Sequence, residues 1–257
     1  MYAIGELGAS QLGSRDAVGE LNAGGRRTRI VLPEARPRRR RATLDRDAIV
    51  AAAIRIIDVE GADALSMRRL GTELGSGATS VYRHVRDKNQ LIALAFDAIT
   101  GEIPLPDPGM AWDEALIGAA RGVRDLFHRH EGFVLLIGRR AILGPSTMAI
   151  LERLVGILRT AGFGDQTSFH AISLTINYAS GFTILEILPA LRGAGGAGVL
   201  EYRQLVSSYL ERVPPDTYPH AAIVAPQMVG KGDADFEYGV RAIMAGIRSL
   251  GRPDEDR

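Results

Sequence analysis

The side chains with the clearest chemistry form a short run of hydrogen-bond donors near residue 80. These residues are Thr79, Ser80, Tyr82, Arg83 and His84. Hydroxyl, guanidinium and imidazole groups can bond to base edges in the major groove of DNA, and a tyrosine hydroxyl suits a phosphate. Val81 and Val85 are four residues apart, so on a helix both can face the core while the donors face outward. The run is therefore typical of a helix that enters the major groove.

Two cations flank this run. Arg68 lies at the start of the preceding predicted helix, where it could reach a base or the backbone, and Lys88 lies at the start of the following one. A basic side chain at a helix N-terminus is unfavourable for the helix dipole. That cost is understandable if the amide end of the helix faces a phosphate, so we expect Lys88 to contact the DNA backbone.

The segment around the donors has the start and stop signals of four helices. They are predicted to run from Asp45 to Gly61, from Ser66 to about Leu74, over residues 78–85, and from Asp87 onward. Gly75-Ser76-Gly77 supplies a tight turn between the second and the third. Two short helices joined by a glycine-containing turn and packed on a longer first helix are typical of a helix-turn-helix.

The rest of the chain shows no alternating strand pattern, which predicts an all-α fold. Three prolines between Pro104 and Pro108 break the helical pattern. We therefore predict a helix-turn-helix DNA-binding domain over 44–102 and a helical domain over 103–257. Helices of the second domain are predicted over 112–130, 131–143, 145–162, 165–188, 199–212 and 233–250, with loops at 193–198 and 213–232.

Residues 1–43 are rich in glycine, alanine and arginine without apolar periodicity, which predicts a disordered tail. The chain has a net charge of +1, yet residues 26–41 hold eight arginines and one acid. A basic end on an otherwise acidic body favours a polyanionic partner. The arginines just before the first helix could reach the DNA backbone or minor groove, or form a solvated linker. These residues are Arg38, Arg39, Arg40 and Arg41.

The sequence lacks the motifs of catalytic and metal sites. It has no cysteine, no phosphate-binding loop ending in Lys-Ser/Thr, no HExxH and no Gly-x-Ser-x-Gly. His128 and His130 are two residues apart, so on one helix they face different sides and are not expected to share a metal. His170 is interpreted as an interior, hydrogen-bonded residue. We therefore predict no enzyme activity, no cofactor and no metal.

The most apolar segment, residues 171–191, contains serine, threonine, asparagine and glutamate. It is too polar for a typical membrane span, and we interpret it as a buried helix that could also line a pocket or form a dimer interface. The N-terminal residues show no apolar signal core, which favours a cytoplasmic location and no membrane partner.

Residues 44–95 resemble the DNA-binding domain of the tetracycline-repressor (TetR) family. The resemblance is carried by Leu65-Ser66-Met67-Arg68-Arg69-Leu70, Leu74-Gly75, Ser80-Val81-Tyr82-Arg83-His84-Val85, Asp87-Lys88 and Leu91-Ile92, with Ala52-Ala53 and Gly61 upstream. It implies groove-facing positions at Ser66, Arg68, Thr79, Ser80, Arg83 and His84, and phosphate contacts at Tyr82 and Lys88. The family often has Pro or Gly in place of Thr79, so its base preference is not carried over.

The part beyond Trp112 resembles the family's effector domain. The similar stretches are Trp112-Asp113, Gly138-Arg139-Arg140, and Leu151 through Gly162-Phe163. The resemblance implies a homodimeric repressor that binds a palindromic, double-stranded operator and is released by a small-molecule effector. Leu136 stands where the tetracycline repressor has its magnesium-binding histidine, so tetracycline–magnesium is not the expected effector. A transcriptional activator of the same fold, a helical enzyme and a membrane-associated protein are the alternatives.

The same resemblance places the dimer interface on the helices predicted over 165–188 and 233–250. The apolar stripe of the second helix is consistent with that. It consists of Val240, Ile243, Met244 and Ile247. In the first helix, Ala179 and Gly181 are small enough to allow a partner helix to approach closely. The ligand-binding residues are not identified from the sequence.

Overall fold

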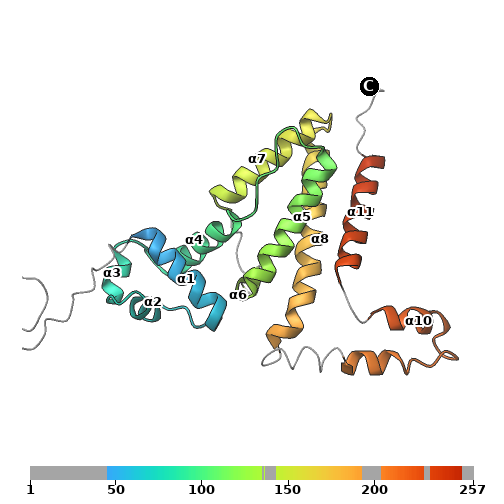
Figure 1. The fold of residues 1–257 in the computed structure, drawn as a ribbon, viewed down its shortest axis with the longest axis horizontal. Coiled ribbons are helices and arrows are strands. Elements are labelled where there is room, and N and C mark those ends of the chain that lie inside the picture. The colour runs from blue at the N-terminus through green and yellow to red at the C-terminus, as the bar shows by residue number, and fades with distance from the viewer. Residues whose placement is uncertain (1–44, 135, 137–142, 193–203, 229–231, 251–257) are drawn as a thin grey trace, which may run out of the picture. The chain divides into compact units, whose positions relative to one another are not determined.

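The computed structural model describes residues 45–134, 136, 143–192, 204–228 and 232–250 (Figure 1). The predicted tail over 1–43, with Arg38 to Arg41, lies outside these residues. The described part is built from helices and contains no strand, which confirms the all-α prediction. Residues 44–257 form one compact unit, and one apolar cluster includes residues from both sides of the boundary placed after residue 102. That boundary stays a prediction.

The first four helices are α1 (Arg46–Glu60), α2 (Met67–Glu73), α3 (Ala78–Tyr82) and α4 (Lys88–Thr100). Three of them begin at the predicted caps, because the side chains of Asp45, Ser66 and Asp87 each accept a backbone N–H three residues on, at 2.7, 3.1 and 2.8 Å. The third helix is shorter than the predicted 78–85. The N–H groups of His84 and Val85 both bond to the Val81 carbonyl, and the chain then leaves the helix for the extended backbone of Asp87.

The turn between α2 and α3 depends on two glycines. Gly75 has a φ of +61°, in the left-handed region that glycine adopts without strain. Gly71, inside α2, lies against the backbone of the turn, and its carbonyl accepts a 2.8 Å bond from Ser76 N. A Cβ on Gly71 would lie 2.9 Å from the Ser76 oxygen and 3.0 Å from Ala78 N. The angle between α2 and α3 therefore requires the absence of a side chain at position 71.

We expect Gly71→Ala to lower the free energy of unfolding by about 1–3 kcal/mol, because the added methyl group meets backbone that cannot move aside. Gly118→Ala is the matched control. Gly118 lies on an exposed turn of helix α5 (Trp112–Arg129), and nothing lies within 4 Å of a Cβ built there. The substitution should stabilise the fold by about 0.5–1 kcal/mol. Urea unfolding followed by circular dichroism measures both. Equal effects of the two substitutions would contradict this account of the turn.

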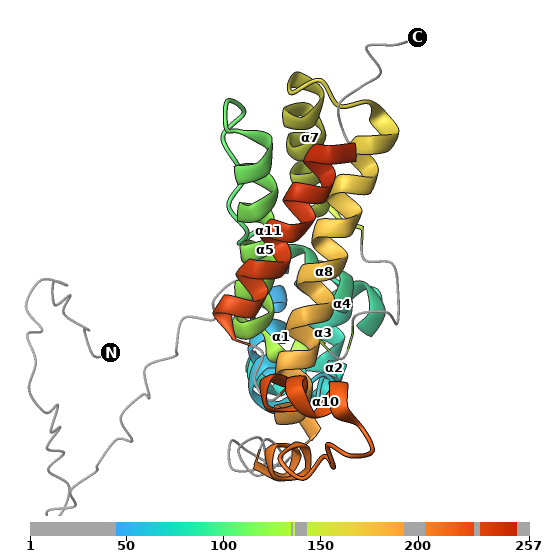
Figure 2. The ribbon, with the colours of Figure 1, turned by 90° about the vertical axis from the view of Figure 1, so that its right-hand side faces the viewer.

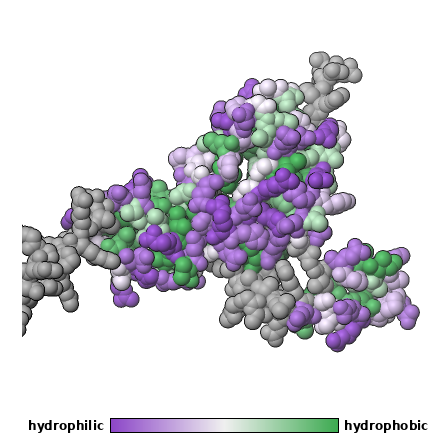
Figure 3. Space-filling view, in the orientation of Figure 1, coloured by the Kyte–Doolittle hydropathy of each residue, from purple (hydrophilic) through white to green (hydrophobic). Residues whose placement is uncertain are grey.

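The second half of the chain contains α5 (Trp112–Arg129), α6 (Glu131–Val134), α7 (Pro145–Thr160), α8 (Asp165–Arg192), α10 (Pro219–Val224) with the 3-10 turn η1 (Ala225–Met228), and α11 (Asp233–Leu250). Residues 204–210 are also helical, within the predicted 199–212. The predicted loop over 213–232 is wrong in part, because Pro219 starts α10 at a position where its missing N–H costs no hydrogen bond. The large apolar side chains of α10, Ile223 and Val224, are exposed. Figure 3 shows hydrophobic surface over this part of the molecule.

Helix α8 is the central helix of this half, with α5, α7 and α11 packed along it (Figures 1 and 2). Over Asp165–Leu188 it is long and apolar enough to cross a membrane, a property that core helices of soluble proteins share. Its buried polar residues suit a protein interior. Thr175 and Thr183 are fully buried, and each hydroxyl donates to the carbonyl four residues earlier, at 2.8 and 2.7 Å. The prediction for His170 is wrong, because it lies on the exposed face of the helix.

An arginine on α5 joins the three long helices. Arg124 donates two 2.9 Å bonds to Glu186 on α8 and lies 2.8 Å from Asp233 at the start of α11. Its guanidinium also lies 4.8 Å from the ring centre of Phe236. These contacts raise the pKa of Arg124 despite its partial burial, and they fix where α11 begins.

One contact between the helix-turn-helix and the second half of the chain lies at α6. Phe133 is fully buried there, and its ring packs edge-on against Phe96 of α4. A Cβ on Gly132 would lie 2.2 Å from the Ile57 carbonyl, so α6 and α1 are in very close contact. His130, the C-cap residue of α5, also belongs to this contact. It is buried, and its ring nitrogens lie 2.9 Å from Asp58 of α1 and 3.3 Å from a carboxylate oxygen of Glu102.

Candidate DNA-binding surface and effector cavity

The donor face of α3 is exposed. Val81 and Val85 are buried, with exposed fractions of 0% and 1%, and they fasten the helix to the core. Thr79, Arg83 and His84 are exposed, Ser80 is half-buried, and Tyr82 is 54% exposed. The spacing of the residues predicted this arrangement, with an apolar pair facing the core and hydrogen-bond donors facing outward. The donors are therefore accessible to a ligand as large as a DNA duplex.

Two adjacent arginines of α2 have different surroundings. Arg69 Nε lies 3.1 Å from both carboxylate oxygens of Glu60, and Arg69 Nη1 lies 3.0 Å from Glu73. Arg69 therefore ties α2 to α1, and its guanidinium lowers the pKa of Glu60. Arg68 is exposed and has no ion-pair partner in the part of the chain that the structure describes. The sequence analysis missed the role of Arg69, although the spacing of four residues to Glu73 is a usable signal.

We expect Arg68→Ala to weaken duplex binding and to relax the preference at one base position, because a base contact is lost. It should also reduce the salt dependence of binding, because it removes one cation from the surface. Its stability should stay within about 0.5 kcal/mol of the parent protein. Arg69→Ala should mainly lower the free energy of unfolding, because it breaks the ion pairs with Glu60 and Glu73. Its effect on the salt slope should be the smaller one. Fluorescence anisotropy at several salt concentrations and urea unfolding give the two readouts. An unchanged salt slope for Arg68→Ala would show that Arg68 is not part of the DNA-binding surface.

Ser66 and Lys88 contribute to the scaffold as well as to the candidate surface. The Ser66 hydroxyl accepts the Arg69 N–H at 3.1 Å, which leaves its own proton to donate. Lys88 Nζ donates to the Ala62 carbonyl at 3.2 Å and is half-buried, so the sequence-based picture of a lysine directed only at phosphate is incomplete. An ammonium has three donors, so two remain for other partners.

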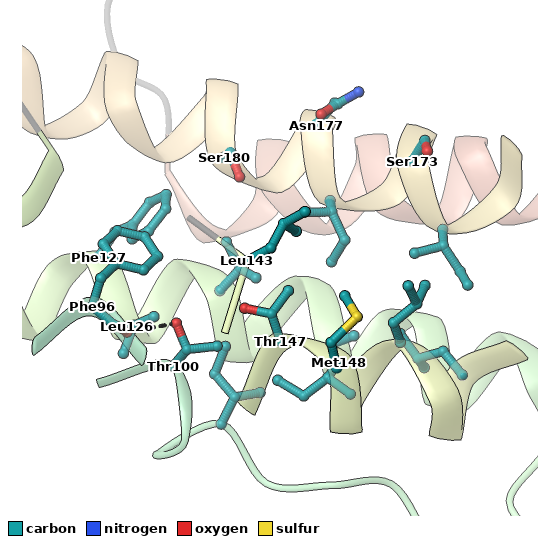
Figure 4. Close-up of a pocket in the computed structure, with 18 residues that line it drawn as sticks. Phe96, Thr100, Leu126, Phe127, Leu143, Thr147, Met148, Ser173, Asn177 and Ser180 are labelled. Carbon is teal, nitrogen blue, oxygen red and sulfur yellow. Dashed lines mark hydrogen bonds between the residues drawn. The ribbon is translucent and has the colours of Figure 1, made fainter. Parts of the chain in front are cut away.

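A cavity of about 420 Å³ lies between α4, α5, α7 and α8 (Figure 4). Its walls are mainly apolar, and all of its polar lining residues among the described ones are uncharged. The apolar lining includes Phe96, Leu126, Phe127, Met148, Ile150, Leu154 and Ile176, and the polar lining consists of Thr100, Thr147, Ser173, Asn177 and Ser180. The described residues contain no group of three histidine, aspartate or glutamate side chains placed to hold a metal ion. Such walls suit an organic molecule with few polar groups.

Figure 4 shows how the labelled side chains lie around the cavity. Phe96 and Phe127 lie together at one end, and Thr147 and Met148 project from α7 on the opposite side from α8. The amide group of Asn177 points away from the space. Leu136, which the family resemblance implied at the position of the magnesium-binding histidine, is buried but does not line this cavity.

Most of the apolar stripe of α11 is covered by the chain itself. Val240, Met244 and Ile247 are buried in the chain's own clusters, because α11 packs on α5 and α8. Ala179 of α8 is buried in the same way, whereas Gly181 is exposed. Apolar side chains on the outward faces of the two helices are Leu174 and Leu185, each 55% exposed, and Tyr238, 78% exposed.

The chain matches two family descriptions. "Bacterial regulatory proteins, tetR family" matches residues 49–95, and "Tetracyclin repressor-like, C-terminal domain" matches residues 105–250. These matches cover the helix-turn-helix and nearly all of the helices that follow it.

Curated relatives and solved structures agree with these matches. The HTH-type transcriptional repressor DrrR1 of Streptomyces coeruleorubidus is 31% identical over 212 residues, which cover 81% of this chain and 78% of that protein. The class A tetracycline repressor from Escherichia coli is 29% identical over 210 residues, or 79% and 90% of the two chains. The structure of ActR from Streptomyces coelicolor in complex with actinorhodin superposes with a TM-score of 0.73 at 31% identity, over 82% of this chain and 99% of ActR. The chain is therefore a transcriptional regulator rather than an enzyme, and it belongs to the TetR family.

Proposed function

We propose that this protein is a repressor that binds a palindromic operator as a homodimer and is released when a small molecule fills the cavity. The observation that carries the proposal is the donor face of α3, exposed on a helix that Val81 and Val85 fasten to the core. We assign base contacts to Ser66, Arg68, Thr79, Ser80, Arg83 and His84, and phosphate contacts to Tyr82 and Lys88. Arginines 38 to 41, which precede α1 in the sequence, would add phosphate or minor-groove contacts.

The outward faces of α8 and α11 supply the dimer contact in this proposal. Leu174, Gly181 and Leu185 follow one side of α8 at helical spacing, and Tyr238 is the most exposed aromatic residue described on α11. Burying Leu174 and Leu185 against a second copy would favour association by roughly 1–1.5 kcal/mol for each side chain, counted as area removed from water, because each is already about half covered. The two copies of α3 would then be held at one fixed separation, which a palindrome with half-sites about one helical turn apart matches.

The cavity indicates the class of effector. Its uncharged, largely apolar walls and its pair of phenyl rings favour a flat aromatic compound with a few hydroxyl or carbonyl groups. ActR, whose structure contains actinorhodin, provides a relative with a bound small molecule. Release from DNA requires that the effector bind better to the conformation with low DNA affinity.

Selection of bound sequences from random duplexes tests the proposal. We expect enrichment of a palindrome, one dimer per duplex by light scattering, and affinity that falls with salt at a slope of about −0.9 per phosphate contacted. Failure to enrich any sequence, or enrichment of a site without two-fold symmetry, would contradict it.

A further inference from the structure

The C-terminal half of α4 is fastened to the start of α7 by one carboxylate. Asp97 Oδ1 accepts the backbone N–H of Ser146 at 2.9 Å. The N-cap position of α7 is Gly144, which has no side chain to accept an N–H, so Asp97 supplies the cap from a different helix. A carboxylate at a helix N-terminus is also favoured by the helix dipole.

The two helices fit closely on both sides of this hydrogen bond. A Cβ on Gly144 would lie 2.1 Å from Asp97 Oδ1. A Cβ on Gly101, one turn after Asp97, would lie 3.1 Å from Ser146 Oγ. We call the contact of Asp97 with Gly144 and Ser146 the α4–α7 clasp. Because Asp97 on α4 holds the Ser146 N–H on α7, a displacement of α7 at this point must move α4 or break the clasp.

The clasp forms part of the cavity wall. Phe96 precedes Asp97 on α4, and Thr147 and Met148 follow Ser146 on α7, and all three line the cavity. The labelled side chains of these residues surround the same space in Figure 4. A molecule in the cavity would therefore touch the neighbours of the clasp on both helices.

The other half of α4 belongs to the helix-turn-helix. Leu91 and Ala95 are fully buried in its core, and Lys88 donates to the Ala62 carbonyl between α1 and α2. The helix is continuous from Lys88 to Thr100. One rigid element thus has one end in the DNA-binding core and the other end at the cavity.

We propose that Asp97 is the positioning residue that couples occupancy of the cavity to the affinity of α3 for DNA. The inference rests on the proposed function and adds the residue through which the effector acts. When the clasp is intact, a molecule that displaces Thr147 or Met148 shifts α4 and changes the position of α3. When the clasp is broken, the cavity still fills, and the DNA affinity no longer responds.

The absence of cysteine from the sequence permits a test with a defined occupant. Ser180, half-buried on α8, lines the cavity, and Ser180→Cys gives one attachment point for N-phenylmaleimide, a neutral aromatic probe. Mass spectrometry gives the labelled fraction. The dissociation constant for the selected duplex is then measured by anisotropy before and after labelling. Circular dichroism melts confirm that each variant is folded.

Labelling should weaken duplex binding by about tenfold in the Ser180→Cys protein, within the range usual for coupled sites. In the Ser180→Cys protein that also carries Asp97→Ala or Gly144→Ala, which break the clasp from opposite sides, the change on labelling should fall within about twofold. Asp97→Asn should retain most of the response, because its amide oxygen can still accept the Ser146 N–H. Asp107→Ala is the matched control, since Asp107 also accepts a backbone N–H, from Gly109 at 2.8 Å, but lies in the loop before α5.

Two results would overturn the proposal. One is an equal loss of affinity on labelling with and without the clasp, and the other is no loss in the Ser180→Cys protein. In either case the unlabelled proteins would still bind the palindrome. Failure of the proposed function is distinguishable, because then the unlabelled parent protein would not bind a palindromic duplex at all.

Discussion

Arg83→Ala should weaken operator binding by about 5–150-fold, the range expected when one well-placed contact between arginine and a base is lost. Arg83 is exposed at the C-terminal end of α3 and has no ion-pair partner among the described residues, so its guanidinium is available to a base edge. Tyr82→Phe removes only a hydroxyl, and its loss should be about fivefold, as for one hydrogen bond. Anisotropy with the selected duplex at fixed salt concentration measures both.

The matched control for this prediction is Arg86→Ala. Arg86 is also an arginine near the end of α3 and is 81% exposed, but its Nε lies 3.0 Å from Asp87. Removing it changes the net charge equally, so it reports the general electrostatic effect alone. Arg83→Ala should also relax the preference at one base position, which Arg86→Ala should not. If both variants bound with equal affinity and selectivity, α3 would not be the recognition helix.

Phe133→Ala should lower the free energy of unfolding by about 3–5 kcal/mol, the usual cost of removing a buried phenyl ring. The side chain is 0% exposed, and its ring centre lies 6.2 Å from that of Phe96 and 6.0 Å from that of His130. These neighbours belong to α4 and to the end of α5, and the backbone of α6 is in close contact with α1. The vacated space therefore cannot close without movement of helices that belong to the helix-turn-helix.

Urea unfolding at a single protein concentration measures this loss, because association would otherwise change the apparent stability. Val59→Ala is the control on the neighbouring helix α1. Val59 is 83% exposed, so its truncation should change stability by no more than about 0.5 kcal/mol. A loss below about 1 kcal/mol for Phe133→Ala would show that the joint at α6 contributes little to folding.

Local signals in the sequence were sufficient to predict the helices of the helix-turn-helix. Asp45, Ser66 and Asp87 cap their helices as predicted, because an N-cap depends on a side chain and a backbone group only three residues apart. The burial of Val81 and Val85 follows from helical periodicity in the same way. These features need no knowledge of which distant segments meet.

Features that depend on distant segments were missed or assigned wrongly. A stripe such as Val240, Met244 and Ile247 is apolar whether it packs within its own chain or against a partner. Helical periodicity therefore does not predict that α5 and α8 cover it. The burial of His130 depends on Asp58, which lies 72 residues away in sequence. The cavity could not be predicted either, since it exists where side chains from four helices fail to fill a space.

Arg68 and Arg69 are adjacent in the sequence but have different roles, one at the exposed surface and one in the scaffold. Arg69 is engaged by Glu60 and Glu73, so it sets the angle of α2 and tolerates little change. Arg68, with no such partners among the described residues, can vary without cost to the fold. In an evolving lineage, or in a designed library, operator preference can therefore drift at the exposed positions of α2 and α3 while the scaffold stays constant. New operators then become accessible through single substitutions that pass through folded intermediates.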